Sequence, residues 1–121
     1  MYYLAAILLV FIGTAHSYLG ERYILTRLFH NDNLPQLFGG TEFTKNTLRF
    51  AWHLTTVAWF GFALLVVYLS INSINIHVIN KIISGTFFLH FIVAFVGSKG
   101  KHFSWFIFLI ISALTFFSSN T

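Results

Sequence analysis

Charged residues and cysteine are what this 121-residue chain most obviously lacks. Only 8% of its residues are charged, whereas a soluble domain carries roughly 25%, and 57% are apolar. The complete absence of cysteine excludes disulfides, thiolate metal sites and cysteine nucleophiles. The length allows one domain, residues 1–121, and the composition places that domain in a lipid bilayer.

Four apolar stretches are long enough to cross a hydrocarbon core of ~30 Å at a rise of 1.5 Å per residue. The connections between the last three are short, so these stretches must run antiparallel to their neighbours. The sequence therefore predicts an all-α fold, an integral-membrane, up-down four-helix bundle. Its expected spans are residues 2–19, 50–69, 76–96 and 103–117.

The only long connection, residues 20–49, is not uniformly polar. Within it Ile24, Leu25 and Leu28 share one helical face, which predicts a short interfacial helix between the first two spans. A cleaved signal peptide is the rival interpretation of the first span, but the basic segment that would precede its apolar run is missing.

Basic residues predict the orientation, because cytoplasmic loops are enriched in lysine and arginine. Only Lys81 lies on the opposite side from the other six, so we expect residues 20–49 in the cytoplasm and both termini outside. The net charge of +4 then indicates contact with anionic lipid headgroups rather than with nucleic acid. The six residues on the cytoplasmic side are Arg22, Arg27, Lys45, Arg49, Lys99 and Lys101.

Histidines carry the candidate chemistry, because no Asp or Glu falls inside an expected span. That absence argues against an ion exchanger driven by a buried carboxylate. The alternating topology puts one histidine from each helix on the cytoplasmic side, while His77 lies on the other. We expect His16, His53 and His90 to converge inside the bundle, and His102 to lie at its surface. An alternative interpretation is that each of these histidines has only a structural role, in which its ring bonds a neighbouring backbone carbonyl.

Two kinds of site would suit these imidazoles. Haem b needs two histidines, taken from His16, His53 and His90, with Arg49 or Lys99 near its propionates. Trp52 and Trp105 lie at the same level. A non-haem Fe, Cu or Zn site needs three or four ligands. Its expected ligands are His16, His53, His90, His102 and Glu21.

Glu21 reaches the histidines only if the first helix breaks at Gly20, because a regular helix separates it from His16 by about 140°. Given that break, Glu21 has three expected roles: metal ligand, hydrogen-bond acceptor that orients an imidazole, or ion-pair partner of Arg49.

Two short motifs resemble small four-span bacterial inner-membrane proteins of unassigned function. One runs from His16-Ser17 to Gly20-Glu21-Arg22, and the other from Arg49 through Trp52-His53. The resemblance implies the four-helix membrane fold and a bacterial inner-membrane location, and it implies no activity. Membrane b-type cytochromes share the gross architecture, but none of their motifs is matched.

These observations lead us to expect a haem b or redox-metal protein that supports membrane electron transfer, with a quinone near Trp52 and Trp105. A different class remains open, a non-catalytic accessory subunit that packs against a larger membrane complex or against further copies of itself. A third is a membrane enzyme that depends on a histidine-bound metal. Phosphate-binding loops, serine-nucleophile elbows and the zinc motif His-Glu-x-x-His are all missing from the chain.

Overall fold

The structure is a computed structural model that describes residues 1–71 and 73–118. It is all-helical, with 79% of residues in helices and, within that part of the chain, no strand beyond an isolated bridge between Leu37 and Gly40. The elements are α1 (Tyr2–Leu19), a π-helical segment η1 (Gly20–Leu25), α2 (Thr26–Leu28), α3 (Glu42–Tyr68), α4 (Ile76–Ser98) and α5 (Ser104–Ser118).

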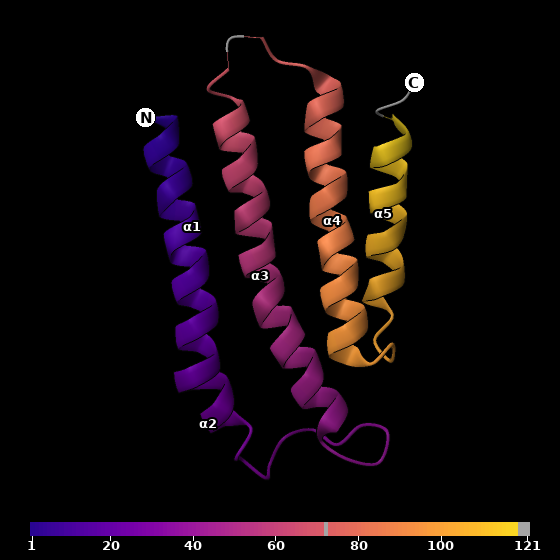
Figure 1. Cartoon of the computed structure of the whole chain (residues 1–121). Coiled ribbons are helices and arrows are strands. Elements are labelled where there is room, and N and C mark those ends of the chain that lie inside the picture. Colours follow the sequence, from indigo (N-terminus) through magenta and orange to yellow (C-terminus); the bar gives the residue numbers. More distant parts are fainter. Residues whose placement is uncertain (72, 119–121) are drawn as a thin grey trace.

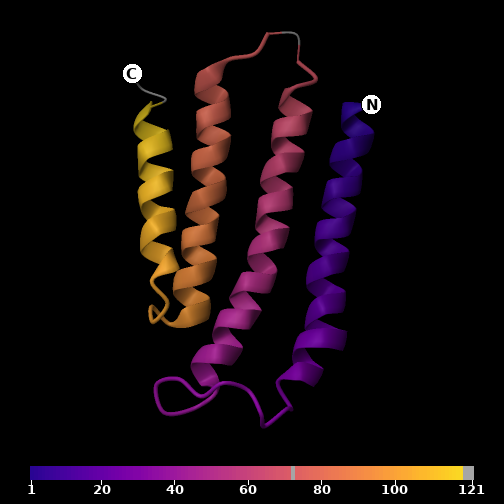
Figure 2. The same cartoon turned by 180° about the vertical axis from the view of Figure 1, so that it is seen from behind.

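The four long helices stand side by side in the order of the sequence (Figures 1 and 2). Contacts join α1 to α3, α3 to α4, and α4 to α5, and the described parts of α1 and α5 touch no helix beyond their one neighbour. The closed four-helix bundle expected from the sequence is therefore not observed. The helices run up and down as predicted, but they form an open row, with α1 and α5 at its two edges.

Three helical segments are long and apolar enough to span a membrane: Tyr2–Leu28, Glu42–Tyr68 and Ile76–Ser98. The fourth expected span corresponds to α5, which is apolar but has only 15 residues. A spanning helix usually needs about 17 to 25.

The first helix continues past its expected end at residue 19. Gly20 keeps right-handed helical angles (φ −62°, ψ −48°), so η1 and α2 extend α1 without a break as far as Leu28. The separate interfacial helix predicted for the connection is thus the end of the first helix. The break at Gly20 that shared metal ligation by His16 and Glu21 would require is absent, because the chain changes there to the wider π-helical turn and does not leave the helix.

Small side chains form the helix interfaces. Large apolar side chains such as Phe11 and Phe62 are exposed on the surface of the row, while the fully buried positions are mostly Ala, Gly, Ser and Thr. Gly61 of α3 packs on Thr86 of α4 with no space for a Cβ between them. Close backbone approach at small residues is the usual way in which helices associate in lipid.

Candidate functional site

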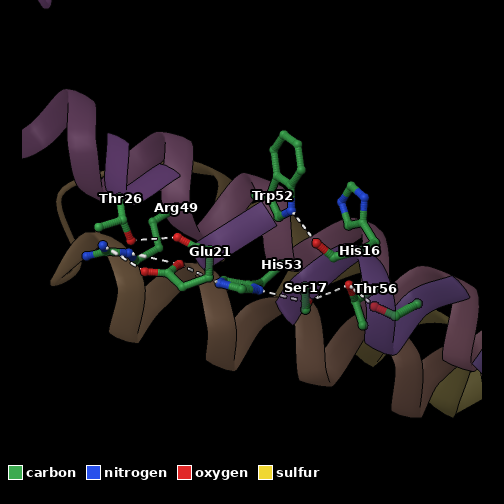
Figure 3. A network of polar contacts seen from close by, with 9 residues as sticks. His16, Ser17, Glu21, Thr26, Arg49, Trp52, His53 and Thr56 are labelled. Carbon is green, nitrogen blue, oxygen red and sulfur yellow. Dashed lines mark hydrogen bonds and ion pairs between the residues drawn. The ribbon is translucent and has the colours of Figure 1, made fainter. Parts of the chain in front are cut away.

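A group of linked polar side chains lies between α1 with η1 on one side and α3 on the other (Figure 3). Five residues make it up, and we call them the α1–α3 polar network: Ser17, Glu21, Arg49, His53 and Thr56.

Helical spacing explains why these side chains meet. Ser17 and Glu21 are four residues apart and share one face, and Arg49, His53 and Thr56 follow each other at spacings of four and three. His16 is rotated by about 100° from Ser17, so it projects to another side of α1. Glu21 accordingly meets His53 and not His16.

Glu21 joins the residues at the end of the network nearest the α2–α3 connection. Its carboxylate lies 2.8 Å from Nη2 of Arg49, and Nε of Arg49 donates to the same carboxylate at 3.2 Å. Oε2 of Glu21 is also 3.2 Å from Nε2 of His53. These are two of the three roles expected for Glu21, ion-pair partner and orienting acceptor. Glu21 and Arg49 are 37% and 46% exposed, so the pair positions the imidazole more than it stabilises the fold.

A chain of hydroxyl groups continues from the other side of the imidazole. Nδ1 of His53 lies 2.8 Å from Oγ of Ser17, and that Oγ lies 2.6 Å from Oγ1 of Thr56. Thr56 in turn donates to the carbonyl oxygen of Gly13 at 3.1 Å. Both ring nitrogens of His53 are therefore engaged by side chains, and neither is free to bind a metal without loss of a hydrogen bond.

Counting hydrogens along this chain ties the hydroxyl directions to the charge of His53. A carboxylate only accepts, so Nε2 of His53 carries a hydrogen toward Glu21. If Thr56 donates to Gly13, then Ser17 must donate to Thr56, and Nδ1 must donate to Ser17, which makes the ring an imidazolium. In a neutral ring with hydrogen on Nε2, Ser17 donates to Nδ1 instead. The gain or loss of one proton at His53 thus reverses the Ser17 hydroxyl.

A groove of about 650 Å³ runs beside the network and has Ser17, Glu21, His53 and Thr56 in its wall. Most of its remaining lining is carbon, including the ring of Phe60. Two further donors, the hydroxyl of Tyr18 and the guanidinium of Arg22, stand at the same groove, 2.7 Å from each other. The groove therefore suits a largely apolar molecule that presents a few hydrogen-bonding atoms.

His16 occupies an aromatic environment on a different side of α1 from the hydroxyl chain (Figure 3). Its ring stacks on Trp52 at 4.5 Å between ring centres and meets the edge of Trp59 at 5.0 Å. The indole nitrogen of Trp52 donates to the backbone oxygen of His16 at 2.9 Å. Nε2 of His16 is buried and has no hydrogen-bond partner in the described part of the chain.

His90 is buried, as expected, but at another interface. Its Nδ1 donates to the carbonyl of Thr86 at 2.8 Å, and its ring packs on Phe87 and Phe108 of α4 and α5. The same ring borders a cavity of about 280 Å³ between α3 and α4. Because α1 does not touch α4, His90 shares no interface with His16. His53 lies on α3, which does contact α4, but both of its ring nitrogens are turned toward α1 and η1, at Ser17 and Glu21. The structure does not bring these three histidines together.

The remaining candidates lie outside the α1–α3 polar network, and the ring of His102 packs on Phe43 and Phe50 of α3. Nδ1 of His102 accepts from the backbone N–H of Ser104 and lies 2.9 Å from its hydroxyl, at the start of α5. Trp105 donates to the carbonyl of Gly100 at 3.1 Å, and Trp105 packs on phenylalanines of α4. His77 is exposed near the opposite end of the row, as expected.

The role of Ser17 was missed in the sequence. Its hydroxyl connects His53 to Thr56, yet a serine beside a histidine near a helix end carries no distinctive pattern. The available signal was its spacing of four residues from Glu21, which marks a shared face.

Within residues 1–71 and 73–118, no group of three or more His, Asp and Glu side chains is placed to hold a metal ion. Comparison with known proteins adds no relative to this picture: no protein-family model, no curated protein and no solved structure matches the chain.

Proposed function

We propose that this chain is an integral membrane protein whose α1–α3 polar network binds a quinone-type carrier and exchanges a proton with it during membrane electron transfer. One observation carries the proposal: an imidazole held between a carboxylate and a hydroxyl chain lies in the wall of a groove whose exposed surface is almost entirely carbon. A quinone is largely apolar and presents carbonyl oxygens, which accept hydrogen bonds from such donors.

In this proposal the row crosses a bacterial inner membrane four times, with both termini outside and the α2–α3 connection in the cytoplasm. The short helix α5 spans with local thinning of the bilayer. Six of the seven basic residues then lie on the cytoplasmic side, together with all three acidic residues. The groove lies at the cytoplasmic end of α1 and α3, where protons are available from water.

His53 is the proton-exchanging group in this proposal. Glu21 and Arg49 hold the ring, and Ser17 follows its protonation state through the direction of its hydroxyl. A ligand carbonyl in the groove accepts a hydrogen bond from the polar network. When His53 loses a proton from Nδ1, the Ser17 hydroxyl turns and donates to Nδ1, so the hydrogen bond between the two side chains is kept. The network itself would exchange only the proton. The electrons would have to be supplied by a separate redox centre, the haem b or transition metal expected from the sequence.

Haem itself is less well served by this geometry than a quinone. Both nitrogens of His53 are engaged, Nε2 of His16 is enclosed by aromatic rings, and His90 lies at a different interface. An absorption spectrum and metal analysis of protein purified from its native membrane, with His53→Ala and His90→Ala beside it, establish whether the chain holds a redox centre. A Soret band lost in either variant would assign haem to this chain.

Quinone binding is tested on the detergent-purified chain with a short-chain ubiquinone, by isothermal titration calorimetry. Ser17→Ala and His53→Phe should weaken binding by roughly fivefold to a hundredfold, the range for a lost hydrogen bond with a buried partner left unpaired. Ser112→Ala removes a matched hydroxyl from the α4–α5 interface and should leave binding unchanged. Absence of binding to the folded wild-type chain, or equal loss in Ser17→Ala and Ser112→Ala, would refute the proposal.

A second candidate function is that of an accessory subunit, and the open row is the observation that favours it. Helices α1 and α5 each have one partner within the chain, so the described row has two edges available to a larger complex or to another copy. Native gel electrophoresis of mildly solubilised membranes tests this candidate. Migration as a monomer would contradict it.

A further inference from the structure

Lys81 is a cation without a counter-ion inside the described chain. It lies five residues after the start of α4, its side chain is exposed, and no carboxylate pairs with it in the described part. The three acidic side chains of the sequence are Glu21, Asp32 and Glu42, and all belong to the opposite end of the row. Within the described part of the chain, Lys81 therefore has no acidic side chain near it and can pair with an anion of another molecule.

Two grooves flank α4 and share the strip of its surface that carries Lys81, Gly85 and Phe88. The groove on the α5 side has a volume of about 550 Å³ and is lined further by Leu109 and Ala113. The groove on the α3 side has a volume of about 420 Å³. Lys81 thus stands at one end of both grooves.

The walls of these grooves offer almost no hydrogen-bonding group to a ligand. On the α5 side, Ser84 donates to the carbonyl of Ser112 at 2.8 Å, and Ser112 donates to the carbonyl of Ser84 at 2.9 Å. On the α3 side, the hydroxyl of Thr86 donates to its own helix at Ile82. The free surface of both grooves is therefore hydrocarbon, and it suits alkyl chains.

Gly85 lies on the strip that separates the two grooves, and its lack of a side chain leaves the surface of α4 low at that point. A Cβ placed on Gly85 would meet no other atom within 4 Å, so this position faces open space. The strip from Lys81 to Leu89 is about 12 Å long at 1.5 Å per residue. This length matches the part of an acyl chain that is nearest the headgroup.

We infer that an anionic diacyl phospholipid straddles α4, with one acyl chain in each groove and its phosphate at Lys81. The inference rests on the membrane insertion proposed above but not on the quinone site. The two grooves meet at Lys81, and the two acyl chains of a phospholipid likewise meet at the glycerol that carries its phosphate. A lysine near the end of a spanning helix reaches the headgroup level by extending its side chain.

The test is lipid retention, measured by native mass spectrometry on the whole chain released from detergent containing equal amounts of phosphatidylglycerol and phosphatidylcholine. The wild-type chain should retain phosphatidylglycerol in preference. Lys81→Gln should reduce that preference by roughly fivefold, the size expected for one lysine near anionic headgroups. Lys81→Arg should keep it, and so should Lys101→Gln, which removes a cation at the other end of the row.

Gly85→Leu tests the grooves separately from the charge. The leucine side chain should reduce retention of both lipids, and Gly85→Ala is the milder variant to use if the leucine variant fails to elute as a single species. Unchanged preference in Lys81→Gln would overturn the inference. Equal retention of the single-chain lysophosphatidylglycerol would overturn the straddling arrangement. Short-chain ubiquinone binding should be the same in Lys81→Gln and wild type, so failure of the quinone site is distinguishable from failure of this one.

Discussion

Gly20 lies directly against the indole ring of Trp52, and a Cβ at residue 20 would overlap the indole nitrogen. That nitrogen is the group that donates to the backbone of His16 at 2.9 Å. The absence of a side chain at Gly20 therefore allows η1 to approach α3 closely enough for Glu21 to reach His53.

Gly20→Ala should destabilise the chain by about 1–3 kcal/mol, because the methyl group displaces a packed ring. It should also shift tryptophan fluorescence, since the Trp52 indole must move. Thermal unfolding in detergent and the emission maximum measure the two effects. Gly85→Ala is the matched control in an open helical position, and it should leave the chain unchanged or stabilise it by up to about 1 kcal/mol. Equal effects of the two substitutions would contradict the packing described for Gly20.

Glu21 and Arg49 should show weak energetic coupling despite their short distance. Both side chains are more than one-third exposed, and exposed pairs contribute under about 1 kcal/mol. A double-mutant cycle of Glu21→Gln and Arg49→Gln, read by thermal unfolding, measures the coupling. The coupling should decrease further as salt is added. A value near 3 kcal/mol, insensitive to salt, would mean that this pair is shielded from water by something outside the chain.

Ser84 and Ser112 should be coupled across the α4–α5 interface. Each hydroxyl donates to the carbonyl of the other residue, so either alanine substitution leaves one of two reciprocal bonds. Interhelical hydrogen bonds in membrane proteins average about 0.6 kcal/mol and reach about 1.7, and we expect a coupling in this range. Thr14→Ala, which removes a hydroxyl bond confined to α1, serves as the control and should show no coupling with Ser84→Ala.

The topology follows from the lysine and arginine distribution and is tested by reporter fusions. A reporter that is active only in the cytoplasm should be active when fused after Asn33 and inactive when fused after residue 121. A reporter that needs export should give the reverse pattern. Activity of the cytoplasmic reporter at both positions would mean that α5 does not cross the bilayer, and three spans would replace four.

The sequence predicted the helical class and the apolar segments well, because long uncharged stretches have few alternatives. Two helices extend beyond the apolar spans expected for them. α3 begins at Glu42, eight residues before its apolar stretch, since a helix continues wherever its backbone bonds are satisfied and not only where lipid would surround it. The spacing of apolar residues did not predict the π-helical turn that begins at Gly20.

Convergence of the histidines was the larger miss, and its cause is geometric. The expectation assumed that four helices close around one axis. In the row, α3 uses one side for α1 and another for α4, and the angle between these sides decides whether the row closes. Polar residues mark the side of α3 that meets α1, but apolar residues cover its other sides, so the sequence does not show which of them meets α4. The link from Glu21 to Arg49 survived because it involves only two adjacent helices.

An open row in which helices touch only their sequence neighbours also has a consequence for biosynthesis. Each tertiary contact between helices joins segments separated by one connection, so the order of translation is also the order of assembly. When α3 emerges, its partner α1 is already present, and the same holds for α4 and then α5. The Glu21–Arg49 and His53–Ser17 contacts can thus form in the first hairpin while the second is still being made.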